Sequence, residues 1–212
     1  EDYRTRVPAG CRLLCGSQYA LLRPEFAALR PYSLRRRAEP QLRQLLITMG
    51  GVDKDNATGQ VLEALLSGAL PVDCRITVVM GATAPWLSEV ERLAQNMPWP
   101  TQVKVGVRDM AQLMADSDLA IGAAGATTCE RCCLGLPTGM LVLAENQRYA
   151  AWLLDQAQAV RMLNLGANLP SELASFIREV AGSGEYLKEL CERARTITDG
   201  EGCQRSAEWL IS

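Results

Sequence analysis

The stretch DLAIGAAGATTCE, residues 118–130, indicates how this chain folds. The part up to Gly122 is a short apolar run, which is typical of a buried strand. Residues 122–126 are all glycine or alanine and predict a tight turn, and a helix is expected over 128–134, ended by Gly135 and Pro137. A strand that passes through a small-residue turn into a helix is the repeating unit of a parallel α/β sheet.

The same alternation continues on both sides of this stretch. Further strands are expected over 45–49, 75–80, 102–105, 139–143 and 160–163, and further helices over 57–66, 86–95, 109–115, 147–158, 171–180, 185–195 and 204–211. The pattern predicts an α/β fold, a Rossmann-like parallel sheet with helices on both faces. Such sheets bind ligands at the carboxyl ends of their strands.

Residues 1–44 do not continue this pattern. They hold four of the chain's ten prolines and the run Arg35, Arg36 and Arg37, which we interpret as a solvated linker or helix face. We therefore expect residues 1–44 to be a crossing segment from an N-terminal domain outside this sequence, and residues 45–212 to form the α/β domain. Because residue 1 is not Met, the sequence is expected to begin inside a longer protein.

Charge and hydropathy exclude several classes of function. The net charge of -2 and the pI near 5.4 argue against a general nucleic-acid-binding protein. No apolar stretch reaches membrane-spanning length, and the first residues do not resemble a signal peptide, so a cytoplasmic protein is expected.

Cysteine and histidine usage limits the chemistry. The eight cysteines are interpreted as reduced thiols, although Cys11, Cys15, Cys129 and Cys132 leave a four-thiolate zinc site as an alternative. The first of these pairs has an unusual C-x3-C spacing, so we predict no metal and no other cofactor. The chain has no histidine, so none can act as a general base. No catalytic residue is assigned to this chain.

The turn over 122–126 is the strongest candidate for a binding site. Its small residues let a ligand approach the backbone, and the following helix directs free N–H groups toward it, which suits a phosphate. The candidate phosphate contacts are Gly125, Ala126, Thr127 and Thr128, with Glu130 as an acceptor for ribose hydroxyls. An ordinary turn with a threonine N-cap, and a glutamate favoured by the helix dipole, explains these residues equally well.

Three more loops are expected at the same edge of the sheet. Gly50 and Gly51 follow a strand and form either a phosphate cradle or a plain turn. Residues 107–110, from Val107 to Met110, offer backbone groups to a base. Glu145, Asn146 and Gln147 offer polar groups to a sugar, unless Asn146 only caps a helix. The chain lacks both the P-loop motif G-x-x-x-x-G-K-[ST] and the dinucleotide motif G-x-G-x-x-G.

Four stretches carry a resemblance to a known family: residues 118–151, YALLRPEF at 19–26, ITMGGVD at 47–53 and DGEG at 199–202. Together they resemble the C-terminal domain of the two-domain UDP-sugar glycosyltransferases with the GT-B fold. Among these is the peptidoglycan enzyme that transfers N-acetylglucosamine to lipid I. The finer similarity is to the UDP-2,4-diacetamido-2,4,6-trideoxy-β-L-altropyranose hydrolases of pseudaminic acid biosynthesis, with the LRPEF stretch as the most specific piece.

The resemblance implies that this chain is the UDP-binding half of a hydrolase that releases UDP from a UDP-linked diacetamido-trideoxy sugar. The resemblance implies the same ligand contacts that were proposed above for each loop, and it places the uracil near residues 107–110. The general base would be a histidine of the missing N-terminal domain, so the chain alone is expected to bind UDP and to turn over little. The UDP-binding half of a glycosyltransferase and a non-catalytic binding module are the alternatives.

Overall fold

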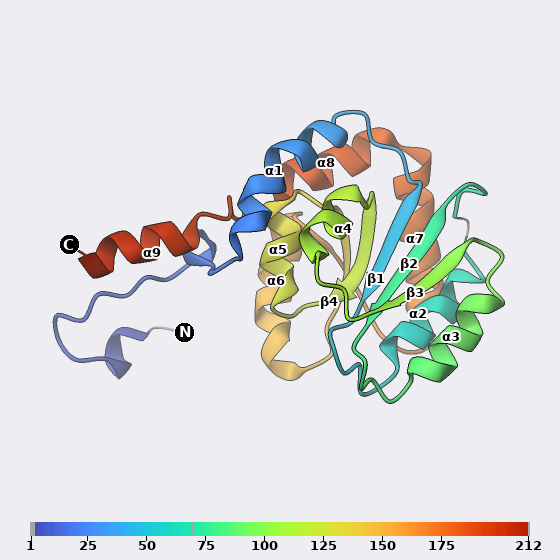
Figure 1. Ribbon diagram of the computed structural model, residues 1–212, viewed down its shortest axis with the longest axis horizontal. Helices are drawn as coiled ribbons and strands as arrows, with labels where there is room; N and C mark the ends of the chain where they lie inside the picture. The colour runs from blue at the N-terminus through green and yellow to red at the C-terminus, as the bar shows by residue number, and fades with distance from the viewer. Residues whose placement is uncertain (1–2, 69, 212) are drawn as a thin grey trace.

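The computed structural model describes residues 3–68 and 70–211, and a six-stranded sheet lies at its centre (Figure 1). The strands are β1 (Gln44–Thr48), β2 (Arg75–Met80), β3 (Thr101–Val105), β4 (Leu119–Ala123), β5 (Thr138–Leu141) and β6 (Arg161–Leu163). They lie in the order β3-β2-β1-β4-β5-β6, and every neighbouring pair is parallel. The predicted α/β fold class with a Rossmann-like parallel sheet is confirmed.

Helices cover both faces of this sheet. They are α1 (Pro24–Arg36), α2 (Ala57–Leu65), α3 (Leu87–Gln95), α4 (Met110–Asp116), α5 (Thr127–Cys133), α6 (Arg148–Gln156), α7 (Leu169–Gly182), α8 (Gly184–Ala194) and α9 (Gly202–Ile211), with short 3₁₀ turns η1 (Tyr3–Arg6), η2 (Ser17–Tyr19) and η3 (Glu145–Gln147). Every strand and helix predicted beyond residue 44 is present, with ends shifted by a residue or two.

Alternation along the strands builds a core on each face. Ile47 of β1 packs in one core with Val61 of α2 and Phe176 of α7, and all three side chains are fully buried. The neighbouring Leu46 points to the other face, where it packs with Met114 of α4 and the N-terminal helix α1. Helices therefore cover both faces of the sheet, as in parallel sheets generally, although β2 and β3 stay partly open on the face beside α4.

Helix α1 is an element that the sequence pattern did not predict. It begins at Pro24, whose fixed backbone angle suits the first turn of a helix, and it buries Phe26 completely. The helix packs against α4 and α5. The second half of the segment 1–44 is thus part of the body of the fold, while its origin in another domain stays a prediction. Residues 1, 2, 69 and 212 lie outside the described part of the chain.

The interpretation of the arginine run as a solvated face was wrong for Arg37, and Arg36 is only partly exposed. Arg37 is only 4% exposed, and its guanidinium donates to the carbonyl oxygens of Met114 (3.0 Å) and Ser117 (2.6 Å) at the end of α4. Arg36 pairs with Asp118 at 2.6 Å. These contacts bridge segments about 80 positions apart in sequence, so the local pattern gave no sign of them.

The N-terminal segment and α9 extend together from the same side of the molecule (Figure 1). Arg205 of α9 donates to the carbonyl oxygen of Gln18 at 2.9 Å, and the Arg12 guanidinium lies 3.4 Å from the ring centroid of Trp209. A Cβ on Gly202 would lie 2.3 Å from the carbonyl oxygen of Ala20, so this contact requires glycine. The first and last segments of the chain thus stabilise each other.

Asp53 holds the start of α2, and its loss is expected to be costly. Its buried carboxylate accepts hydrogen bonds from the backbone nitrogens of Ala57 (2.8 Å) and Thr58 (2.9 Å). We expect Asp53→Ala to lower the free energy of unfolding by about 1–3 kcal/mol, because two buried N–H groups lose their acceptor. Urea denaturation measures this, with the exposed neighbour Asp55→Ala as the control. Equal effects of the two substitutions would contradict the capping role.

Candidate functional site

The strand order places a topological switch point between β1 and β4. From β1 the chain continues to β2 and β3 on one side, and from β4 it continues to β5 and β6 on the other. Ligands of open α/β sheets bind outside the carboxyl ends of the strands at such a point. Thr48 pairs with Gly122, so the loop after β1 and the turn after β4 leave the sheet side by side. This edge is the candidate site.

The turn between β4 and α5 presents its backbone at this edge. Thr128 N–H donates to the carbonyl oxygen of Gly125 at 3.0 Å, which closes the turn. The N-cap residue of α5 is Ala126, and no side chain caps the helix, so the alternative of a threonine cap is wrong. The atom nearest to the position of a Cβ on Gly125 is Nε2 of Gln147, at 3.9 Å. The backbone at Gly125 is therefore open to a neighbouring group.

Arg131 lies beneath this turn and was not predicted as a site residue. Its side chain is 1% exposed and runs back toward the start of α5. The guanidinium donates to the carbonyl oxygen of Ala123 (2.7 Å) and to the hydroxyl oxygens of Thr127 (2.9 Å) and Thr128 (3.4 Å). Burial lowers its pKa to about 10, so the group stays charged at neutral pH. An arginine four positions after Thr127, and therefore on the same side of the helix, was the available signal.

Glu130 occupies the first turn of α5 and is partly buried. Burial raises the pKa of its carboxyl, while the positive charges of Arg23 and Arg131 act in the opposite direction. No ion pair within 4.0 Å of this carboxylate exists among the described residues. The carboxylate is thus left with acceptor capacity for a ligand hydroxyl.

The loop after β5 lies beside the turn, because β4 and β5 are paired up to Ala123 and Leu141. Gln147 bridges the two: its Oε1 accepts from the backbone nitrogen of Leu143 at 3.0 Å, which leaves its amide nitrogen near Gly125. Glu145 is exposed and pairs with Arg148 at 3.1 Å. Asn146 lies within η3, and no side chain caps that turn or α6, so its interpretation as a helix cap was wrong.

The loop after β1 is shaped by close backbone packing. Gly50 has a φ of 92°, which glycine adopts readily, and Gly51 packs on the end of β2. A Cβ on Gly81 would lie 2.1 Å from the carbonyl oxygen of Gly51, so only glycine fits there. Trp86 adds a hydrogen bond from its indole nitrogen to the carbonyl oxygen of Lys54, at 2.9 Å. Gly81 is a second residue that positions the site and that the sequence did not single out.

Residues 107–110 follow β3 at the same edge of the sheet. Gly106 has a φ of 65° and turns the chain out of the strand. Asp109 then caps α4 by accepting from the backbone nitrogen of Gln112 at 3.0 Å. Val107 and Met110 are half-buried. The loop lies at the correct edge of the sheet for the predicted contact with a base, and that contact remains a prediction.

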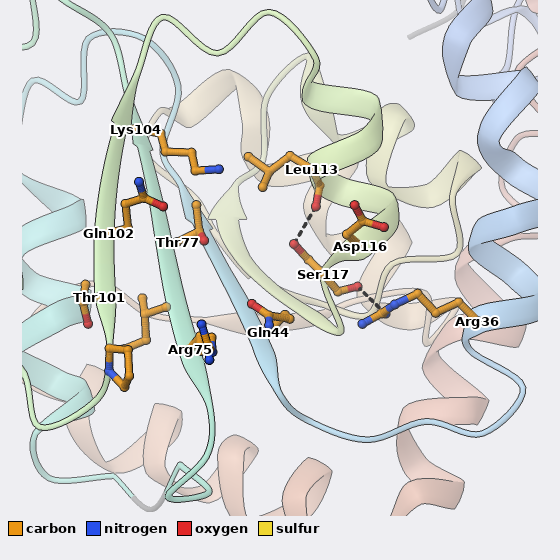
Figure 2. Close-up of a pocket in the computed structure, with 12 residues that line it drawn as sticks. Arg36, Gln44, Arg75, Thr77, Thr101, Gln102, Lys104, Leu113, Asp116 and Ser117 are labelled. Carbon is orange, nitrogen blue, oxygen red and sulfur yellow. Dashed lines mark hydrogen bonds between the residues drawn. The ribbon is translucent and has the colours of Figure 1, made fainter.

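Two cavities lie near this region, and the smaller one borders the β4–α5 turn. The larger, about 710 Å³, lies on the open face of β2 and β3 beside α4, and Figure 2 shows the polar side chains of Thr77, Gln102 and Lys104 pointing into it. A second cavity of about 450 Å³ lies between α5 and α6 and borders Gly125 and Thr128. Its lining is mainly apolar. We place the candidate site at the loops rather than in the larger cavity, because open parallel sheets bind ligands at their strand ends.

Four of the eight cysteines are buried, and three are exposed. Cys132 and Cys133 in α5 are buried, and burial raises the pKa of the Cys132 thiol to about 12. Over residues 3–68 and 70–211, no three His, Cys, Asp or Glu side chains are grouped so that they would hold a metal ion. Within the same residues, no helix is long and apolar enough to cross a membrane.

Comparison with known proteins identifies the family. The family described as "Glycosyltransferase family 28 C-terminal domain" matches residues 45–201, which include the whole parallel sheet except Gln44. This chain belongs to that family. The chain is accordingly a nucleotide-sugar-binding domain, and its fold is that of the C-terminal, Rossmann-like half of GT-B proteins.

Individual proteins are similar over most of the chain. The spore coat polysaccharide biosynthesis protein SpsG of Bacillus subtilis is 29% identical, over 96% of this chain and 60% of its own length. The UDP-2,4-diacetamido-2,4,6-trideoxy-beta-L-altropyranose hydrolase of Campylobacter jejuni is 26% identical, over 76% of this chain and 55% of its own. The MurG structure of Acinetobacter baumannii superposes with a TM-score of 0.70 at 20% identity, covering 96% of this chain and 56% of MurG. The chain thus spans 55–60% of the length of these proteins.

Proposed function

We propose that this chain is the UDP-binding part of an enzyme that processes a nucleotide sugar. The observation that carries the proposal is the β4–α5 turn at the switch point, with an open glycine backbone and a buried cation beneath it, in a member of this family. Backbone N–H groups and positive charge at such a position suit the diphosphate of a nucleotide sugar.

Each loop of the candidate site contacts a different part of the nucleotide sugar in this proposal. The diphosphate lies on Gly125, Ala126, Thr127 and Thr128, with Gly50 and Gly51 on its other side. Glu130 accepts hydrogen bonds from the ribose hydroxyls. The uracil lies against residues 107–110, and the sugar faces Glu145, Asn146 and Gln147. The nearness of the Gln147 amide nitrogen to Gly125 supports a shared diphosphate and sugar site at β4 and β5.

Glycosyl transfer is the reaction that we now favour for the whole protein. The family match is to the C-terminal domain of a glycosyltransferase family and covers residues 45–201. Hydrolysis remains the second candidate, supported by the YALLRPEF stretch and by the hydrolase relative. In both reactions UDP leaves the anomeric carbon. Hydrogen-bond donors at the turn would stabilise the negative charge that develops on the departing diphosphate.

The two reactions are separated by what accepts the sugar. Incubation of the whole protein with a UDP-sugar in water alone, followed by measurement of released UDP, tests hydrolysis directly. Release that is stoichiometric with free sugar supports the hydrolase. Release that requires an added hydroxyl acceptor supports the transferase.

Thr127 provides a test of the diphosphate position. Its hydroxyl oxygen accepts from Arg131, which leaves its O–H group available to donate to a phosphate oxygen. We expect Thr127→Val to weaken UDP binding by about 0.5–1.5 kcal/mol, the usual value of one hydrogen bond, and to leave uridine binding nearly unchanged. Titration with both ligands measures this. Equal losses for UDP and uridine would remove Thr127 from the diphosphate site.

A further inference from the structure

Arg131 is a buried cation that forms no ion pair within the described part of the chain. It is 1% exposed, and none of the described residues forms an ion pair with it within 4.0 Å. Its partners are three neutral oxygens, and its Nε has no hydrogen-bond partner. A buried charge that forms no ion pair is costly, so such groups are normally paired. The carboxylate of the neighbouring Glu130 acts on Arg131 electrostatically but lies beyond ion-pair distance.

The guanidinium lies near the start of α5, and this position raises the free-energy cost of burying its charge. Although Arg131 lies in the second half of α5, its side chain runs back to Thr127 at the start of the helix and to Ala123 at the end of β4. Exposed backbone N–H groups make that end of a helix electropositive. Arg37, the other deeply buried arginine, differs in this respect. It donates to carbonyl oxygens at the C-terminal end of α4, which is the electronegative end of a helix.

The fold also reserves space for this cation. A Cβ on Gly122 would lie 2.7 Å from Nη1 of Arg131 and 3.1 Å from the carbonyl oxygen of Thr48. Glycine at this position of β4 therefore lets the guanidinium lie between the strand end and the turn. The cation is placed directly below the backbone that a ligand would contact, and it is shielded from water.

We propose that Arg131 is a positioning residue whose buried charge, which forms no ion pair among the described residues, makes the β4–α5 turn selective for a diphosphate. The inference rests on the proposed function, since the ligand's diphosphate supplies a counter-charge at the turn. Arg131 acts through the turn: it fixes Thr127, Thr128 and Ala123 by hydrogen bonds, and its charge attracts the phosphates without contacting the uridine. Selectivity for UDP over uridine is therefore expected to depend on it.

The test compares Arg131→Met and Arg131→Lys with the wild-type chain, using UDP and uridine as ligands. We expect Arg131→Met to weaken UDP binding at least about tenfold, as for a lost charge-assisted interaction, and to change uridine binding little. Arg131→Lys keeps the positive charge but cannot make all three hydrogen bonds of the guanidinium. We therefore expect its UDP affinity to lie between those of the wild type and Arg131→Met.

Arg37→Met is the matched control, because Arg37 is also a deeply buried arginine with a pKa lowered to about 10. It is expected to lower the melting temperature without changing the ratio of UDP to uridine affinity. Equal loss of UDP binding in Arg131→Met and Arg131→Lys, or an unchanged ratio in Arg131→Met, would overturn the inference alone. A folded wild-type chain that does not bind UDP would instead overturn the proposed function, and the inference with it.

Discussion

Replacing Glu130 with alanine will weaken UDP binding by about 1.5–3 kcal/mol, a loss of roughly 10- to 150-fold in affinity. The reason is that a partly buried carboxylate without an ion-pair partner accepts the hydrogen bonds of the ribose hydroxyls in the proposed site. Isothermal titration of the wild type and Glu130→Ala with UDP measures the difference. Unchanged UDP affinity in a folded variant would exclude Glu130 from the ribose site.

The pH dependence of binding gives this prediction a second readout. Burial raises the pKa of the Glu130 carboxyl, so its protonation begins at a higher pH than for an exposed glutamate. Only the ionised carboxylate accepts from both ribose hydroxyls, so UDP affinity should fall as the pH drops toward this raised pKa. Glu130→Gln removes that contribution while the titration of the phosphate remains. The difference between the two pH profiles isolates Glu130, and identical profiles would contradict its role.

Replacing Phe176 with alanine will lower the free energy of unfolding by about 3–5 kcal/mol. Phe176 is fully buried in α7, where it packs edge-to-face on Tyr186 with the ring centroids 6.5 Å apart. A Cβ on Gly139 of β5 would lie 2.9 Å from its ring, so the helix and the sheet meet closely there. The truncation would leave a cavity that this tight contact prevents from closing.

Urea or guanidinium denaturation measures the effect, and Trp152→Ala serves as the control. Trp152 is 49% exposed on α6, so its truncation is expected to change stability much less than that of Phe176. UDP binding should survive Trp152→Ala, because its side chain lies outside the proposed contacts. A loss below about 1 kcal/mol for Phe176→Ala would show that this part of the core is loosely packed.

The alternating pattern beyond residue 44 was sufficient to predict the fold class. Runs such as residues 118–122 are apolar because both faces of a parallel strand are buried, and the turns and caps between them are local signals. Asp109 is an example, since its capping bond to Gln112 is formed within four residues of sequence. Such features depend on neighbours in the chain, and the sequence therefore carries them directly.

Features that depend on distant contacts could not be predicted in this way. Helix α1 owes its place to the burial of Phe26 against α4 and α5, and Arg37 is buried because it satisfies carbonyl oxygens about 80 positions away. Gly81 and Arg131 were missed for the same reason. Their importance arises from what packs against them, the backbone of Gly51 in one case and the β4–α5 turn in the other.

The location of the candidate site could be predicted from the sequence, but the hydrogen bonds of its residues could not. Alternation predicted that the loops share one edge of the sheet, and the strand order places the β1 loop and the β4–α5 turn side by side. The hydrogen bonding of the site residues was not predictable. Thr127 accepts a bond from Arg131 rather than capping α5, and Gln147 holds the β5 loop while its amide nitrogen lies near Gly125. The ligand contacts themselves remain proposals.

The central claim is that this chain binds a uridine diphosphate at the β4–α5 turn. Isothermal titration of the 212-residue chain with UDP, and with ADP as the control, tests it most directly. Circular dichroism and a cooperative melting transition establish beforehand that the chain is folded. The account predicts saturable binding of UDP, weaker or undetectable binding of ADP, and loss of UDP affinity in Glu130→Ala. No UDP binding by the folded chain, or equal binding of UDP and ADP, would contradict it.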